Sequence, residues 1–492
     1  MLQEVLEPAR SDNPMAAPAF IAGQWSRDGT PAERIGPHLR KVVTRFASAT
    51  DGQVTQAVEF AARNTKAVAD LAPASRATIL ERAAKLAAAH RDDLARMIAR
   101  ELGKPLKDGR GELDRVADTF AVCAGETRHI GGDVLPVAGW ARGTGNTAMT
   151  YRAPAGVALA ITPFNAPANL LAHKLGASFA AGNSTIVKSP PQAPAVSAAI
   201  VALLLEAGAP LEAVQLLHGG GEVGAALCGA DEVAVISFTG SAETGAAVAR
   251  AAGAKRLVLE LGGNAATIVC ADADLVAAAT VCARTGYTNS GQSCISVQRV
   301  YVQRECFSRF VDELSTQVAA LRVGDPLDPA TDVGSMVDEQ AAERVLAWAT
   351  EAVEGGARIT VGGTRDGATL APTVVADPPA DAAVVTREVF GALVTVLPFD
   401  DFDAVLETGN ASRFGLQAGL FTRDIGRILT AWRELEVGGL IVNGSSNFRL
   451  DHVPFGGVKD SGFGRESPHY MVEDYTVVKT LMLRGLSIWG EN

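Results

Sequence analysis

Cys294 is the residue of this chain best placed to act as a nucleophile. It ends the loop Asn289-Ser290-Gly291-Gln292-Ser293-Cys294, between a helical stretch and a strand. A loop presents a thiol to a surface or cleft, where its thiolate can react. By contrast, Cys270 ends an apolar strand and Cys282 lies in an Ala-rich segment, so both are expected to pack as small hydrophobic residues. The loop alone is weak support, and a structural role for Cys294 stays open.

Two further polar residues follow expected strands and could assist such a nucleophile. Glu260 precedes Leu261-Gly262-Gly263, where paired glycines allow a sharp turn, and partial burial would make its carboxylate a general base. Asn165 follows the expected strand Gly156–Ile161, where its amide could donate to a developing oxyanion together with the N–H of Cys294. The alternatives are a solvated strand-end carboxylate for Glu260 and a helix cap for Asn165.

A candidate anion site joins another expected strand to a helix, in Phe238-Thr239-Gly240-Ser241-Ala242-Glu243-Thr244-Gly245. Its glycines are spaced neither as a dinucleotide fingerprint nor as a Walker loop. The helix N-terminus with a free hydroxyl at Ser241 would nevertheless suit a pyrophosphate. Lys188 ends a further strand, where its ammonium could meet ribose hydroxyls or simply face solvent.

The elements that must position these residues alternate between short apolar runs and Ala-rich helical stretches. This alternation is typical of βαβ units around a parallel sheet, which binds ligands at the carboxyl ends of its strands. We expect strands over Gly156–Ile161, Ser184–Lys188, Val214–Leu217, Val233–Ser237 and Arg256–Glu260. A second α/β unit is expected over residues 262–462, with strands at Ala266–Cys270, Val297–Val302, Val394–Phe399 and Gly439–Val442.

The remaining segments flank these units. Periodicity predicts a helix over Val54–Asp70 and a longer one from Ile79 to Leu102, which Gly103 and Pro105 stop. Thr147–Arg152 and Tyr475–Leu483 are extended and alternating. They form either a local hairpin or arms that add strands to a partner subunit, and oligomerisation is favoured because unpaired edge strands need covering.

Composition excludes several classes of protein. The 492 residues carry a net charge of −11, which disfavours a nucleic-acid binder. The apolar run Ala195–Leu205 is too short to span a bilayer, and residues 1–14 lack a secretory signal. The six cysteines form no CxxC pair and the seven histidines no HExxH motif, so we expect no metal site and a cytoplasmic protein without a nucleic-acid or membrane partner.

The order and spacing of these motifs resemble the aldehyde dehydrogenase superfamily from about Phe20 to Leu483. The resemblance implies that Cys294 is the nucleophile, Glu260 the general base and Asn165 the oxyanion donor. The motifs that carry it are Glu101-Leu102-Gly103-Lys104-Pro105, Thr162-Pro163-Phe164-Asn165, Val187-Lys188-Ser189-Pro190, Phe238-Thr239-Gly240-Ser241, Glu260-Leu261-Gly262-Gly263-Asn264, Gly291-Gln292-Ser293-Cys294, Glu388-Val389-Phe390-Gly391 and Pro454-Phe455-Gly456-Gly457.

The resemblance also implies an NAD or NADP cofactor. Many NAD-preferring members carry a Glu three residues after the motif Lys; here Pro191 stands there, so NADP should be tolerated or preferred because no carboxylate repels a 2′-phosphate. The cofactor contacts that the resemblance implies are Ile161, Thr162, Phe164, Lys188, Ser189, Pro191, Gly221, Phe238, Gly240, Ser241, Gly245, Leu261, Glu388 and Phe390.

The expected substrate is a small polar aliphatic aldehyde, oxidised to the free acid. The sequence around Cys294 and Phe448-Arg449-Leu450-Asp451-His452 is similar to the branch that handles lactaldehyde, glyceraldehyde phosphate and phosphonoacetaldehyde. Arg449, His452 and Phe455 are the candidate substrate residues, although Arg449 and Asp451 could form a surface pair. Ala166 and Ser293 replace the His and Arg that phosphonate-type members often carry, which argues against an anionic substrate.

Three alternatives remain: a succinate-semialdehyde-type dehydrogenase, a non-catalytic family member, and a cysteine hydrolase that pairs Cys294 with His452 or His469. The resemblance implies an α/β fold and a homodimer or homotetramer. Its expected parts are a disordered tail (1–17), a Rossmann-like parallel-sheet NAD(P)-binding domain (18–135 and 153–261), a second α/β catalytic domain (262–462) and small β oligomerisation arms (136–152 and 470–484).

Overall fold

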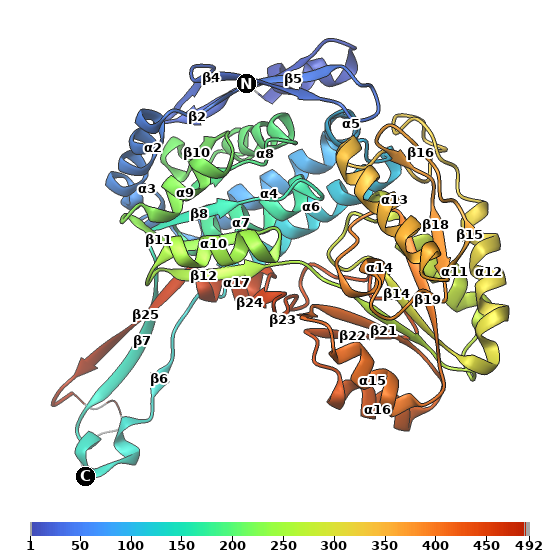
Figure 1. Ribbon diagram of the computed structural model, residues 1–492. Helices are drawn as coiled ribbons and strands as arrows, with labels where there is room; N and C mark the ends of the chain where they lie inside the picture. The colour runs from blue at the N-terminus through green and yellow to red at the C-terminus, as the bar shows by residue number, and fades with distance from the viewer. Residues whose placement is uncertain (1, 487, 489–492) are drawn as a thin grey trace.

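Two α/β lobes and a projecting ribbon make up the protein (Figure 1). The computed structural model describes residues 2–486 and 488. One lobe contains an eight-stranded sheet in the order β24-β12-β11-β8-β9-β10-β2-β3, and the other a seven-stranded sheet in the order β15-β18-β19-β14-β13-β21-β22. The predicted α/β class with two parallel-sheet units is therefore confirmed.

The centre of the first sheet is parallel, as the alternating pattern predicts. Its strands are β8 (Val157–Ile161), β9 (Ser184–Lys188), β10 (Val214–Leu217), β11 (Val233–Thr239) and β12 (Arg256–Glu260). The connecting helices are α7 (Pro167–Ala181), α8 (Pro194–Glu206), α9 (Gly221–Gly229) and α10 (Ala242–Ala252). Antiparallel edges that the sequence did not indicate are β2 (Ala19–Ile21), β3 (Gln24–Ser26) and β24 (Gly462–Phe463).

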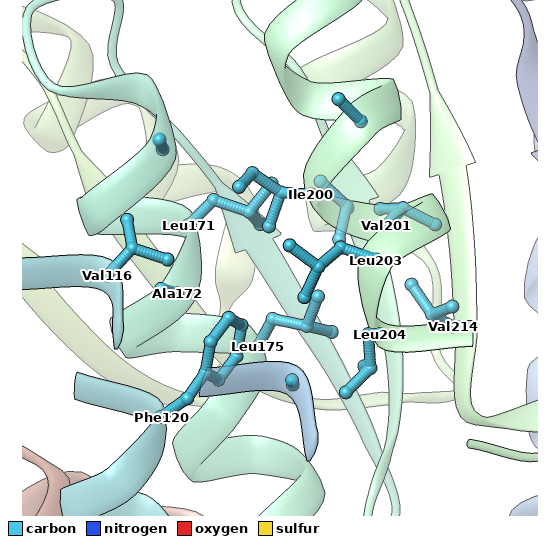
Figure 2. Close-up of a cluster of buried hydrophobic side chains, with 14 of the residues drawn as sticks. Val116, Phe120, Leu171, Ala172, Leu175, Ile200, Val201, Leu203, Leu204 and Val214 are labelled. Carbon is cyan, nitrogen blue, oxygen red and sulfur yellow. The ribbon is translucent and has the colours of Figure 1, made fainter. Parts of the chain in front are cut away.

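A helical layer packs on this sheet through apolar side chains. Figure 2 shows Phe120 of α6 (Leu106–Thr127), Leu175 of α7 and Leu203 of α8 within one buried cluster. The single helix predicted from Ile79 to Leu102 is wrong. The chain forms α4 (Pro73–Ala89) and α5 (Arg91–Leu102), because the backbone of His90 leaves helical geometry at φ −104° and ψ 17°. Likewise, Asn64 divides the predicted first helix into α2 (Asp51–Arg63) and α3 (Thr65–Ala69).

The prediction of a disordered tail is wrong for residues 2–17. Leu2–Leu6 form α1, and Met15–Ala17 form β1, which pairs in parallel with β5 (Val42–Ser48) beside β4 (Thr30–Ile35). The apolar residues Leu2, Val5, Leu6 and Ala9 follow helical spacing and are all buried. Arg100 also donates hydrogen bonds of 2.6 Å to the carbonyls of Pro8 and Asn13.

The second sheet is parallel except for the edge strand β15 (Arg358–Val361). Its other strands are β13 (Ala266–Val269), β14 (Arg299–Gln303), β18 (Thr373–Ala376), β19 (Leu393–Phe399), β21 (Gln417–Phe421) and β22 (Gly439–Val442). Its helices are α11 (Leu275–Gly286), α12 (Phe307–Ala319), α13 (Glu339–Glu354), α14 (Ala383–Thr386), α15 (Phe402–Asn410) and α16 (Ile425–Glu434). Short strand pairs join β16 (Arg365–Asp366) to β17 (Thr369–Leu370), and β20 (Phe414–Gly415) to β23 (Val458–Lys459).

The two extended segments predicted outside the α/β units pair with each other. β7 (Thr147–Pro154) and β25 (Thr476–Leu483) run antiparallel, β6 (Val134–Leu135) adds a third strand, and α17 (Pro468–Asp474) precedes β25. The ribbon projects from the lobes (Figure 1). None of the helices among residues 2–486 and 488 is both long and apolar enough to cross a membrane.

Candidate active site

A cavity of about 870 Å³ lies where the two lobes meet. Its walls come from the carboxyl ends of β8, β9 and β11, from α9 and α10, and from Cys294, Arg344 and Glu388 of the second lobe. Parallel strands end at one edge of the sheet, which explains why residues far apart in sequence converge here. The predicted cofactor contacts that line the cavity are Ile161, Thr162, Phe164, Lys188, Pro191, Gly221, Phe238, Gly240, Ser241, Leu261, Glu388 and Phe390.

Two predicted cofactor contacts, Ser189 and Gly245, lie behind the cavity wall. The hydroxyl of Ser189 is 2.7 Å from Nδ1 of His218, and Nε2 of that ring is 3.2 Å from the carbonyl of Pro18. Nε2 must carry the proton to bond a carbonyl, so Ser189 donates to Nδ1. At Gly245, a Cβ would lie 2.5 Å from the side chain of Leu261. Both residues therefore shape the wall without facing the cavity.

The N-terminus of α10 and the ammonium of Lys188 make the first-lobe side of the cavity suited to an anionic ligand. Ser241 is the N-cap of α10. Its hydroxyl accepts a 3.2 Å hydrogen bond from the N–H of Thr244 and donates one of 3.1 Å to the Thr244 hydroxyl, so the prediction of a free hydroxyl is wrong. The N-terminus of α10 still faces the cavity. Burial lowers the pKa of Lys188 to about 8, which the charge of Glu222 partly opposes. No ion pair engages the Lys188 ammonium within the described residues, so it is available to a ligand.

Cys294 is half-buried in the cavity wall and packs against Ile295, Leu416 and Phe455. Burial raises the pKa of its thiol to about 12; the negative charges of Glu388 and Glu260 add to the increase, and Arg449 opposes it. The thiol is therefore protonated at neutral pH and needs a base, or the loss of a nearby negative charge, to become a nucleophile.

The backbone around Cys294 is closely packed. Asn289, Ser290 and Gly291 form a left-handed run with φ of 50°, 55° and 72°. On the other side, a Cβ on Gly263 would lie 2.1 Å from the carbonyl oxygen of Cys294. The paired glycines after Glu260 therefore allow the two loops to touch, because any side chain at position 263 would collide with the Cys294 carbonyl.

Glu260 ends β12 and is only 3% exposed. Neither carboxylate oxygen has a hydrogen-bond partner in the described part of the chain. Burial raises the pKa of its carboxyl well above the usual range; the nearby negative charge of Glu466 adds to this, and Arg449 and Lys174 oppose it. The alternative of a solvated carboxylate is therefore excluded, and Glu260 has the properties of a buried proton acceptor.

Asn165 lines the cavity, and its side-chain amide donates a 3.1 Å hydrogen bond to the carbonyl of Gln292 in the Cys294 loop. The alternative of a helix cap does not hold, because the N-cap of α7 is Ala166 and no side chain caps that helix. An amide carries two N–H groups, so the second can donate to a ligand beside Cys294.

The candidate substrate residues divide into two groups. The guanidinium of Arg449 is buried 4.1 Å above the ring of Phe455 and donates a 2.8 Å hydrogen bond to Glu466. Arg449 also pairs with Asp451 (Nε to Oδ1, 3.9 Å), but both side chains are buried, so the alternative of a surface pair is wrong. Phe455 belongs to the cluster on which Cys294 packs, and the charge of Arg449 acts on the Cys294 thiol, so Arg449 lies close to the nucleophile. His452 is exposed, and no hydrogen bond joins it to this group within residues 2–486.

Sequence reasoning missed a cluster of buried charges behind Glu260. Lys174 donates to Glu466 (3.1 Å), His173 lies 2.9 Å from Asp451, and Arg115 forms a two-point ion pair with Asp451 at 2.6 and 3.0 Å. A sequence signal was present, because the mostly apolar stretch Pro167–Ala181 carries the two ionisable residues His173 and Lys174. A buried charge needs a partner, and such clusters gather at functional sites.

Comparison with known proteins agrees with this geometry. Residues 25–481 match the family model "Aldehyde dehydrogenase family". The chain belongs to the aldehyde dehydrogenase family. The 3-sulfolactaldehyde dehydrogenase of Priestia aryabhattai is 40% identical to this aldehyde dehydrogenase over 465 residues, or 94% of this chain and 97% of that protein. The lactaldehyde dehydrogenase of Methanococcus aeolicus is 32% identical over 469 residues, covering 94% and 99% of the two chains.

A solved structure has the same fold. The glyceraldehyde-3-phosphate dehydrogenase GapN of Methanocaldococcus jannaschii, complexed with NADP, superposes with a TM-score of 0.88 at 32% identity over 93% of this chain and 99% of that chain. The predicted superfamily and branch are thereby confirmed, and this aldehyde dehydrogenase is an oxidoreductase.

Proposed function

We propose that this aldehyde dehydrogenase oxidises small polar aliphatic aldehydes, of the lactaldehyde and 3-sulfolactaldehyde type, to free carboxylic acids with NAD or NADP. The observation that carries the proposal is the convergence of Cys294, Asn165 and Lys188 on one cavity, with the unpartnered carboxylate of Glu260 behind it. The names of the two relatives support the substrate class.

The first half of the reaction forms an acyl-enzyme. The Cys294 thiol gives its proton to water, and the resulting thiolate adds to the aldehyde carbon to form a thiohemiacetal anion, whose oxyanion accepts hydrogen bonds from the Asn165 amide and the Cys294 N–H. That N–H has no acceptor among the residues that the structure describes, so it is free to serve. Collapse of the oxyanion expels the aldehyde hydrogen as hydride and leaves a thioester on Cys294. A bound nicotinamide supplies the hydride acceptor.

The second half releases the acid. Glu260 takes a proton from water, the resulting hydroxide attacks the thioester carbonyl, and the Cys294 thiolate leaves as the carboxylic acid forms. The raised pKa of the Glu260 carboxyl favours this proton transfer. A chain that transferred the acyl group to a thiol acceptor instead would have no use for a buried base here.

The residues present fit a nicotinamide dinucleotide. The cavity volume of about 870 Å³ is within the range of ligand sites. The α10 N-terminus would hold the pyrophosphate, Lys188 and Glu388 the ribose hydroxyls, and Phe390 one side of the nicotinamide. Pro191 lines the same cavity and carries no charge, which supports acceptance of the 2′-phosphate of NADP. The NADP complex of the archaeal relative supports the same assignment.

The buried charges behind Glu260 support a polar substrate tail. Three cations, Lys174, Arg449 and Arg115, stand against two carboxylates, Asp451 and Glu466, whose pKa values are lowered. Glu260 supplies a third carboxylate, but the buried Nε of Arg449 has no hydrogen-bond partner among the described residues. A hydroxyl or anionic group beyond the aldehyde would therefore be stabilised beside Arg449.

We also propose that the ribbon of β6, β7 and β25 joins subunits into a homodimer or homotetramer. Val478, Leu481 and Met482 of β25 and Tyr151 of β7 are at least half exposed. A three-stranded ribbon with exposed apolar side chains is unstable in water unless another surface covers it. The molar mass in solution, and its fall on truncation of β25, tests this proposal.

Reduction of nicotinamide with a panel of aldehydes tests the function. Lactaldehyde, 3-sulfolactaldehyde, glyceraldehyde 3-phosphate and succinate semialdehyde are assayed with NAD and with NADP, and Cys294→Ala serves as the control. We expect the highest kcat/KM for a lactaldehyde-type substrate, and no turnover by the control. Preference for succinate semialdehyde would assign the semialdehyde alternative, and no reduction with any aldehyde would overturn the proposal.

A further inference from the structure

A buried asparagine links the loop that carries Asn165 to the loop that carries Cys294. The Asn289 side-chain amide donates to the carbonyl of Asn165 (3.0 Å) and to that of Gln292 (3.2 Å). The amide of Asn165 donates to the same Gln292 carbonyl at 3.1 Å. Two amides and two carbonyls therefore form one connected group between the two proposed oxyanion donors.

We infer that Asn289 is a positioning residue, which holds the Asn165 amide at the distance from the Cys294 N–H that the oxyanion requires. The inference rests on the proposed role of Asn165. Asn289 does not line the cavity, so it acts through Asn165 and not on the substrate.

The backbone at position 289 restricts which side chain can make this link. Asn289 has φ 50° and ψ 37°, a left-handed conformation that asparagine and glycine tolerate best. Its own N–H donates a 2.8 Å hydrogen bond to the half-buried carboxylate of Asp108 in α6. Glycine would keep the conformation but lose both donors. Aspartate would keep the size but place oxygens against two carbonyls.

The other side of the Asn165 loop is also fixed. The ammonium of Lys104 donates to the Asn165 carbonyl (3.1 Å) and to Glu112 (2.6 Å). Glu112 accepts the N–H groups of Ala168 and Asn169 at the start of α7, at 2.8 and 3.1 Å. Lys104 and Glu112 therefore hold the Asn165 loop to α6 and α7, and Asn289 ties it to the Cys294 loop.

A double-mutant cycle tests the inference. Asn289→Gly, Asn165→Ala and the double variant are compared with the parent by the single-turnover rate of nicotinamide reduction, its isotope effect with C1-deuterated aldehyde, and KM for NADP. We expect Asn289→Gly to slow hydride transfer by about 10- to 100-fold without changing KM, because misplacing an oxyanion donor costs rate in the transition state. In the Asn165→Ala background, Asn289→Gly should slow hydride transfer by less than about threefold.

The controls separate this inference from the function that it rests on. Asn443 also has a left-handed φ, of 51°, and its side chain contacts Thr422, so Asn443→Gly should loosen a loop equally and leave the single-turnover rate unchanged. If Asn289→Gly does not fold, Asn289→Asp replaces it in the cycle.

Three outcomes would overturn the inference. An Asn165→Ala enzyme that acylates at the parent rate would refute the proposed role of Asn165 itself. If Asn165→Ala is slow and Asn289→Gly slows it further by the same factor as it slows the parent, the role of Asn165 stands. The proposed link from Asn289 to Asn165 is then refuted. An Asn443→Gly enzyme as slow as Asn289→Gly would assign the effect to loop flexibility.

Discussion

The reactivity of Cys294 in the cofactor-free enzyme follows from its surroundings. Burial and the charges of Glu388 and Glu260 raise the pKa of its thiol from 9.0 to about 12. At pH 8 the thiolate fraction falls from ~10⁻¹ to ~10⁻⁴, a loss of about 1,000-fold. A more basic thiolate is a better nucleophile, by about 0.4–0.5 log unit of rate per pKa unit, and this recovers about 20-fold of the lost alkylation rate. We therefore expect alkylation about 50-fold slower than that of an ordinary exposed thiol.

The assay is the rate of iodoacetamide labelling of the Cys294 peptide, followed by mass spectrometry between pH 7 and pH 9 without cofactor. The rate should rise about tenfold per pH unit, because the thiol stays far below its pKa throughout this range. Glu388→Gln removes a nearby negative charge and should speed labelling at pH 8, whereas Arg449→Met removes the opposing cation and should slow it. A rate that levels off below pH 9, or that neither variant changes, would refute this reasoning.

Three further predictions concern the cofactor and the scaffold. Pro191→Glu should lower kcat/KM for NADP by about tenfold or more and leave that for NAD nearly unchanged, because a carboxylate repels the 2′-phosphate; an equal loss with both would remove Pro191 from that subsite. Leu6→Ala should lower the free energy of unfolding by about 2–5 kcal/mol in urea titrations, and a value equal to the parent's would mean that α1 does not pack. Burial lowers the pKa of His218 to about 4 from 6.5. The unfolded chain therefore binds the extra proton, and about 3 kcal/mol of stability should be lost as pH falls from 6.5 to 4. His218→Gln should flatten this pH dependence of the unfolding midpoint, and an unchanged slope would contradict the assignment.

The sequence predicted the parallel sheets because buried strands and helices have different apolar periods. It also placed Asn165 and Glu260 at the carboxyl ends of two strands of one sheet. Cys294 lies on the loop before β14, and only the family resemblance linked it to them. The N-terminal helix was missed because its buried stripe of Leu2, Val5 and Leu6 is short and Pro8 follows it. A stripe of this length is weak when only local periodicity is used.

Contacts between distant segments could not be predicted from one sequence. Lys174 and Glu466 are 292 residues apart, and Asn289 bonds to Asn165 across 124 residues. No local pattern marks either pair, because each depends on how the lobes and loops pack. The same limit applies to Ser189 and Gly245, which belong to cofactor-site motifs but lie behind the cavity wall.

In the proposed mechanism, the Cys294 thiol carries the acyl group after hydride is lost. Peptide mass spectrometry of Glu260→Gln, quenched after mixing with NADP and lactaldehyde, tests it most directly, because removing the base should stop hydrolysis and leave the thioester in place. We predict about one reduced nicotinamide per active site and an acyl adduct on the Cys294 peptide. Reduced nicotinamide without an adduct on Cys294, or an adduct on another cysteine, would contradict the claim.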